Sequence, residues 1–180
     1  MLRFVEWNAT HDLNENGFSL ELKEQIVNEL SKNMTVYISS EGALPKNLDG
    51  CRLKIDPEQI HDFLHGAELF IGDSGTMSVE AALLGTPSIM FSSTAKRLGN
   101  FISLSDEYSL LILCDQEIDL WNSIKELVNN KESKRLWIER SSNFMNSKIN
   151  FTHFLCWLFE DYHKNASKLL EAKVINNYPN

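Results

Sequence analysis

The sequence predicts an α/β fold, a three-layer Rossmann-like domain with a mainly parallel sheet and helices on both faces. Short apolar runs alternate along the chain with longer segments of helical period, which is typical of repeated strand–helix units. Strands that are joined through helices pair in parallel, and their crossovers follow one hand. The 180 residues suit a single domain, in which we expect residues 150–180 to form a C-terminal helical tail.

Composition narrows the class of protein. The net charge of −8 argues against a nucleic-acid-binding surface, and 43% hydrophobic with 23% charged residues is an ordinary globular balance. No apolar run approaches the roughly 18 residues of a transmembrane segment, and the first residues lack a signal-peptide pattern. The cysteines are few, widely spaced and without a CxxC pair, which predicts buried thiols and a cytoplasmic location; they are Cys51, Cys114 and Cys156.

The first third of the chain is expected to contribute three strands and a helix. Ser19 is a typical N-cap residue, and apolar residues follow it at helical spacing. Runs rich in β-branched and aromatic residues indicate strands. The expected strands are Leu2–Trp7, Thr35–Ser39 and Cys51–Ile55, and the segment Glu41–Asp49 is expected to be a loop.

The second helix has a strong start signal. Asp56 is a capping residue, Pro57 fits the first helical position, and Gln59 completes a capping box. Beyond it the alternation continues, with a helix that Gly85 and Pro87 bring to an end. The expected strands are Leu69–Ile71, Ser88–Phe91 and Leu110–Cys114, and the expected helices are 75–84, 117–128, 133–145 and one from Phe151 past Tyr162.

A turn after the fourth expected strand is the most informative segment. Ligands of parallel sheets bind at the carboxyl ends of the strands, which here directs attention to loops 8–18, 39–49, 72–76 and 92–100. Ser74, Gly75 and Thr76 would form the first turn of a helix, where free N–H groups and the helix dipole favour an anion. Gly75 would also let a ligand approach the backbone closely.

Two other interpretations of this turn stay open. One is an ordinary capped helix, with Asp73 or Ser74 as the cap. The other is a serine esterase, because Gly-Asp-Ser resembles the motif of small esterases, with Asp161 and His163 as candidate triad partners. Those two residues lie two apart on an expected helix and therefore face different sides, which disfavours the triad.

The segment Leu69–Pro87, with Gly-Asp-Ser-Gly-Thr-Met followed by Glu-Ala-Ala-Leu-Leu-Gly-Thr-Pro, resembles an uncharacterised family of predicted glycosyltransferases. That family is related to the UDP-N-acetylglucosamine 2-epimerases and has the GT-B architecture of two Rossmann-like domains. Further stretches that resemble it are Phe4–Asp12, Gly99–Ile102 and Phe154–Tyr162. The resemblance covers only the C-terminal half of the family, so the N-terminal, acceptor-side domain is expected to be missing.

The resemblance implies a nucleotide-sugar-binding domain whose ligand is UDP or a UDP-sugar, with no other cofactor. It implies that Ser74 and Gly75 hold the diphosphate and that Glu80 binds the ribose hydroxyls, while Thr76 replaces a second glycine of the epimerase turn. Transfer or epimerisation would need the missing domain or a second copy as partner. The resemblance also implies phosphate- or sugar-facing roles for Asn8, Thr10 and His11, and a base site near Ile55, Pro57 and Ile60.

Weaker signals complete the candidate site. Lys96, Arg97 and Asn100 follow the fifth expected strand and are candidates to reach a phosphate or sugar carboxylate. His61 and His65 share a helix face, but Asp62 stands where the HExxH motif has Glu, so no metal site is expected. The apolar tail Phe151–Phe159 is expected to pack on the sheet, a missing domain or a second copy. A non-catalytic binding or assembly domain is the alternative function.

Overall fold

The computed structural model describes residues 1–6, 17–93, 95–97 and 99–172. Contacts divide the chain into two compact units, Met1–Ser142 and Asn143–Asn180. The first unit holds the whole sheet. The second begins within helix α6 (Ser133–Asn146), a few residues before the tail that the sequence suggested.

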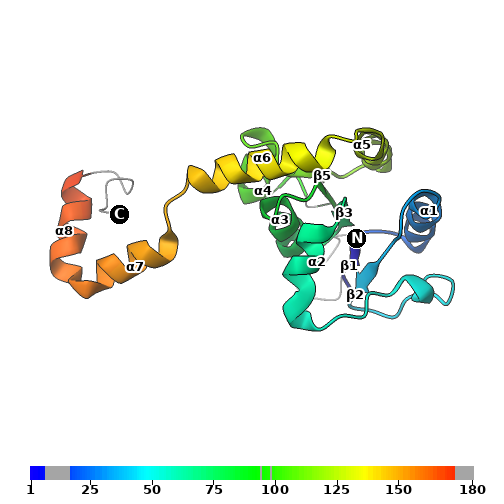
Figure 1. Cartoon of the computed structure of the whole chain (residues 1–180), viewed down its shortest axis with the longest axis horizontal. Helices are drawn as coiled ribbons and strands as arrows, with labels where there is room; N and C mark the ends of the chain where they lie inside the picture. The colour runs from blue at the N-terminus through cyan, green and yellow to red at the C-terminus, as the bar shows by residue number, and fades with distance from the viewer. Residues whose placement is uncertain (7–16, 94, 98, 173–180) are drawn as a thin grey trace. The chain divides into compact units, whose positions relative to one another are not determined.

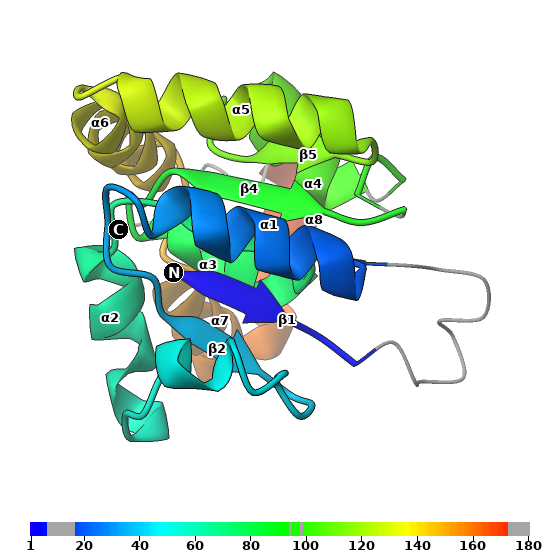
Figure 2. The same cartoon turned by 90° about the vertical axis from the view of Figure 1, so that its right-hand side faces the viewer.

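The first unit is built on a five-stranded sheet in which every pairing is parallel (Figure 2). The strand order is β2-β1-β3-β4-β5, so the chain leaves β1 toward one edge and later returns to pair β3 on the other side of β1. The expected α/β fold with a parallel sheet is therefore confirmed. The strands are β1 (Leu2–Phe4), β2 (Ile38–Ser40), β3 (Phe70–Gly72), β4 (Ser88–Phe91) and β5 (Ile112–Cys114).

The expected third strand, Cys51–Ile55, is reduced to a single parallel bridge between Arg52 and Ile38. A 3-10 turn, η2 (Asp49–Cys51), occupies its beginning. The segment lies outside β2 and so can pair on one side only, and the polar side chains of Arg52 and Lys54 interrupt its apolar run. The bridge still continues the strand order on the far side of β2, as a doubly wound sheet requires.

Helices cover both faces of the sheet, as expected. Helices α1 (Leu20–Leu30) and α5 (Glu117–Asn129) lie on the same side of the strands, in front of them in Figure 2. On the α1 face, the Phe4 ring contacts Phe18 at 5.3 Å between centroids, and the Lys23 ammonium lies 4.9 Å from the centre of the same ring. The opposite face holds α2 (Ile60–Gly66) and α3 (Gly75–Leu83), which bury a hydrophobic cluster of Leu64, Phe70 and Ala81.

Three helix starts that the sequence indicated are confirmed. The Ser19 hydroxyl accepts the N–H of Leu22 at 3.1 Å and caps α1. Asp56 forms its capping box with Gln59, although the first turn is the 3-10 helix η3 (Pro57–Gln59), which leads directly into α2. Ser74 caps α3.

One helix was not expected. Helix α4 (Gly99–Asp106) begins inside the segment that the sequence suggested as a loop. Its buried residues, Phe101 and Leu104, have the helical i, i+3 spacing, but serines between and after them and the opening Gly99-Asn100 pair obscure the period.

After the end of α6, the described part of the second unit holds two helices, α7 (Phe151–Glu160) and α8 (Tyr162–Ala172), where the sequence suggested one. Asp161 separates them with a non-helical backbone at φ −146° and ψ 77°, and the Asn165 side chain donates to the Trp157 carbonyl at 2.7 Å across the break. Phe154 is buried, whereas Phe151 is 64% and Phe159 67% exposed. The expectation that this apolar tail packs on the sheet, a missing domain or a second copy stays a prediction.

The three cysteines are free thiols that differ in burial. Cys114 is buried, as expected, and Cys51 is half-buried. The expectation of a buried thiol is wrong for Cys156, because α7 turns this side chain to solvent within its small unit.

Candidate functional site

The carboxyl ends of β1 and β3 lie side by side at the topological switch point of the sheet, where the strand order reverses. This is the position at which open α/β sheets bind ligands. Asp73, the residue after β3, joins the two ends: its N–H donates to the Arg3 carbonyl at 3.3 Å, and its carboxylate accepts the Val5 N–H at 2.8 Å. Asp73 is buried in this role, so it is not the cap of α3.

Ser74 is the cap, with an extended backbone at φ −87° and ψ 111°. Its hydroxyl accepts the Met77 N–H over a long 3.5 Å, and its carbonyl accepts both the N–H and the hydroxyl of Ser78. Among the described residues, none accepts a hydrogen bond from the N–H groups of Gly75 or Thr76. The ordinary capped helix is therefore present, and it leaves two donors at the positive end of the dipole for an anion.

Packing alone requires glycine at position 75, apart from any ligand. A Cβ atom at this position would lie 2.5 Å from Cζ of Phe101, whose buried ring reaches the turn from α4. Real Cβ atoms do not approach so closely, so glycine lets α4 pack against the first turn of α3. The side of Gly75 that faces Phe101 is thus filled by protein, and an anion would approach the N–H groups instead.

A polar strip runs along the open side of α3 from this turn. Thr76 is exposed and lies four residues before Glu80, so the two share one face of the helix. The Glu80 side chain is 38% exposed, and its Oε2 lies 3.6 Å from Nε2 of His61, which α2 places beside α3. We call Thr76, Glu80 and His61 the polar strip; the sequence suggested the first two and did not suggest His61.

Of the residues suggested for the base side, Ile60 directly precedes His61 of the polar strip. Ile60, the first residue of α2, is half-buried against the Leu64–Phe70–Ala81 cluster, which also contacts Met77 in the first turn of α3. Pro57 begins η3 directly before it and is exposed, and Ile55 is half-buried. The start of α2 therefore lies beside α3, as Figure 1 shows.

Lys96, one of the residues suggested after β4, is paired with carboxylates. Its ammonium donates to Asp115 at 2.7 Å and lies 3.9 Å from Asp119. The hydrogen bond to Asp115 raises the pKa of Lys96 and lowers that of the carboxyl group. A phosphate would have to compete with these carboxylates. Arg97 and Asn100 are exposed, and the suggested residues Asn8, Thr10 and His11 lie outside the described ranges.

The residues suggested for an esterase triad have local structural roles. The Asp161 carboxylate accepts the Lys164 N–H at 3.4 Å, at the start of α8. The His163 ring contacts the neighbouring Tyr162 ring, with centroids 5.9 Å apart. Both belong to the second unit, whereas Ser74 belongs to the first.

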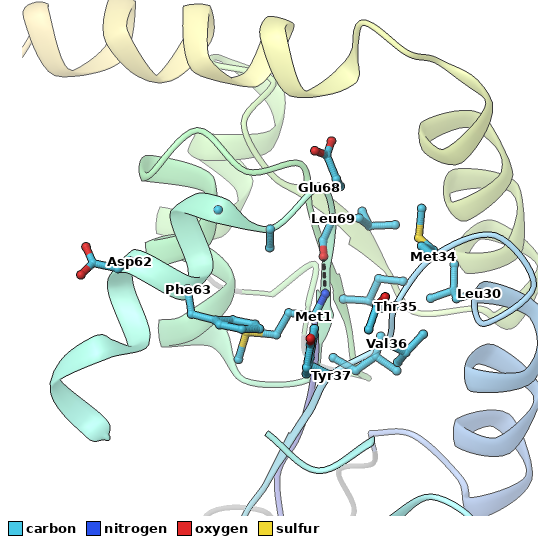
Figure 3. Close-up of a pocket in the computed structure, with 14 residues that line it drawn as sticks. Met1, Leu30, Met34, Thr35, Val36, Tyr37, Asp62, Phe63, Glu68 and Leu69 are labelled. Atoms are coloured by element: carbon cyan, nitrogen blue, oxygen red, sulfur yellow. Dashed lines mark hydrogen bonds between the residues drawn. The ribbon is translucent and has the colours of Figure 1, made fainter. Parts of the chain in front are cut away.

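The opposite edge of the sheet holds an apolar pocket of about 440 Å³, which the sequence did not indicate (Figure 3). At its centre the α-amino group of Met1 donates to the Leu69 carbonyl at 2.7 Å. Burial lowers the pKa of this amine from 8.0 to about 5. Its walls are lined by Leu30, Met34, Val36, Tyr37 and Phe63 among others, which in the sequence look like ordinary core residues.

Comparisons of the chain with protein-family models, curated protein sequences and solved structures find no match. The resemblance described above therefore stays an expectation. Within the described ranges no helix combines the length and apolar character needed to cross a membrane. In the same part of the chain, no three His, Cys, Asp or Glu side chains come together as a potential metal site.

Proposed function

We propose that the first unit binds a nucleotide-sugar, with UDP as the nucleotide, and serves as the donor-binding domain of a glycosyltransferase or a sugar-nucleotide epimerase. The observation that carries the proposal is the polar strip, which begins at the α3 N-terminus, at the reversal point of the sheet. One helix thus offers anion-binding N–H groups and, farther along the same face, a carboxylate.

The chemistry of the strip follows the parts of a nucleoside diphosphate in order. The diphosphate binds the N–H groups of Gly75 and Thr76 and the hydroxyls of the turn. Glu80 lies one helical turn beyond Thr76, about 5–6 Å away between Cβ atoms, and accepts hydrogen bonds from ribose hydroxyls. The start of α2, with Ile60 at its edge, then lies on the base side.

A carboxylate at this position also argues against a second phosphate there. Glu80 would repel an anion, whereas a sugar hydroxyl donates to it without charge conflict. The site is therefore built for a ligand that is anionic at one end and carries hydroxyl groups at the other.

In the proposed architecture, this domain supplies one wall of the site and a second domain supplies the other. Group transfer and epimerisation need groups held on both sides of the reacting centre, since proximity and orientation supply much of the rate. We expect weak nucleotide binding by the 180-residue chain and no turnover until an acceptor-side domain is added. Turnover by the purified chain would show that the reacting centre lies elsewhere.

The test is calorimetric titration with UDP, UDP-sugars, other nucleoside diphosphates and pyrophosphate. Ser74→Ala removes one hydroxyl and keeps the N–H groups, so it should weaken UDP by about 0.5–1.5 kcal/mol. Glu80→Ala should weaken UDP by roughly 1.5–3 kcal/mol, as for a hydrogen bond to a charged group, and leave pyrophosphate nearly unchanged. Glu126→Ala, an exposed carboxylate on α5, is the matched control and should affect neither ligand.

The outcomes separate the alternatives. Absence of binding by every nucleotide at millimolar concentration would leave the ordinary capped helix as the correct interpretation of the turn. Equal losses for UDP and pyrophosphate in Glu80→Ala would refute its ribose role. Ester hydrolysis that Ser74→Ala abolishes would establish the serine as a nucleophile instead.

A further inference from the structure

The pair of His61 and Glu80 joins two helices at the ribose end of the proposed site. His61 is the second residue of α2 and Glu80 belongs to α3, so the tertiary fold, and not helical spacing, makes them neighbours. The side chains are 60% and 38% exposed, which leaves both accessible to a ligand.

The separation of the pair has a chemical consequence. The 3.6 Å between Nε2 and Oε2 is longer than a hydrogen bond, so the two groups do not satisfy each other. No other described residue forms a hydrogen bond with either side chain. A single oxygen atom can, however, lie about 2.8 Å from both, which is hydrogen-bonding distance.

Only certain oxygen atoms fit this position. A hydroxyl donates one hydrogen bond and accepts others, so it can donate to the Glu80 carboxylate while it accepts from the Nε2–H tautomer of His61. A phosphate oxygen has no proton to donate at neutral pH and would be repelled by the carboxylate. A carbon-bound hydrogen, as in a deoxy sugar, can make neither bond.

We infer that His61 and Glu80 together bind one ribose hydroxyl of the nucleotide, so that His61 helps the site discriminate nucleotides that carry this hydroxyl from analogues that lack it. The inference rests on the proposed function and adds a contact residue and a specificity to it. Glu80 accepts from the hydroxyl, and His61 donates to it from the neighbouring helix. Neither side chain needs to leave its own helix face to do so.

The experiment compares the dissociation constants of UDP, 2′-deoxy-UDP and 3′-deoxy-UDP for the intact chain and its variants. The wild-type chain should bind UDP about tenfold tighter than one of the two deoxy analogues, the ratio expected for one good hydrogen-bonded hydroxyl. His61→Ala should weaken UDP several-fold and reduce the logarithm of that ratio to about half, while Glu80→Ala should bring the ratio close to one. Pyrophosphate affinity should not change in either variant.

His65→Ala is the matched control, because it removes an imidazole from the same helix. The His65 ring lies 2.8 Å from the Leu84 carbonyl, away from Glu80, so its loss should leave the UDP to deoxy-UDP ratio unchanged. His61→Gln, which keeps a donor, should restore part of the ratio. An unchanged ratio in His61→Ala overturns the inference and leaves the nucleotide site intact, whereas no nucleotide binding by the wild-type chain overturns the proposed function itself.

Discussion

The buried α-amino group of Met1 should make stability depend on pH. Burial lowers the pKa of the amine from 8.0 to about 5 in the folded chain. The unfolded chain therefore holds a proton between pH 5 and pH 8 that the folded chain does not, so stability rises with pH across this window. Three pKa units at about 1.36 kcal/mol each correspond to roughly 4 kcal/mol, present in full above pH 8 and lost as the pH falls to 5.

N-terminal acetylation isolates this contribution. The acetylated Met1 keeps an N–H that can donate to the Leu69 carbonyl, carries no titrating amine, and has the adjacent pocket of about 440 Å³ to receive the acetyl group. All other titrating groups are common to both proteins, so their effects cancel in the difference.

The assay is urea unfolding of the acetylated and unmodified chains at pH 5.0, 6.5 and 8.5. The advantage of the acetylated chain should grow by about 4 kcal/mol from the highest to the lowest pH. Two stability curves that stay parallel over this range would refute the burial of the amine.

Three further predictions concern side chains that hold the first unit together, and urea unfolding at pH 7 measures each. Gly75→Ala should destabilise the first unit by about 1–2 kcal/mol because its Cβ would press on Phe101. Phe101→Leu in the same chain should recover part of this loss. No loss of stability in the single variant would contradict the close contact. Asp73→Ala should cost about 1–3 kcal/mol because the Val5 N–H loses its acceptor, and the control Asp73→Asn, which keeps an oxygen there, should cost less. Lys134→Met should cost a similar amount, about 1–3 kcal/mol, since the ammonium donates to the carbonyls of His65 and Ala67 at the end of α2 and to the Thr86 hydroxyl. A neutral result would mean that solvent replaces it.

Local signals in the sequence were sufficient for most of the fold. The Ser19 and Asp56 starts depend on residues within one turn of each helix, and the structure confirms both. The strand Ser88–Phe91 has the expected bounds because it is buried on both faces and reads as a continuous apolar run.

The sequence-based predictions were wrong where contacts between distant parts of the chain determine the local structure. Cys51–Ile55 has the composition of a strand but occupies an outer position with one neighbour, so only one bridge forms. Helix α4 depends on Phe101, which packs on Gly75 from a distant part of the chain. The tail was expected as one helix, and Asp161, an adequate helical residue by itself, ends α7.

The candidate site shows the same division. Ser74 as a cap and Thr76 with Glu80 on one face follow from spacing along a single helix. His61 was seen only as a partner of His65, because spacing within α2 cannot reveal what the neighbouring helix presents. Lys96 was expected to face a ligand, and its pairing with Asp115 depends on the return of the chain to β5.

The contact between Gly75 and Phe101 also couples the substitutions that evolution can accept at these two positions. The two positions share one small volume, so a larger residue at position 75 is tolerated only with a smaller one at position 101. Selection therefore acts on the pair, and the order in which two such changes arise matters, because the larger side chain arriving first would disturb the turn. Descendants of this chain should accordingly carry the smaller residue at position 101 before position 75 departs from glycine.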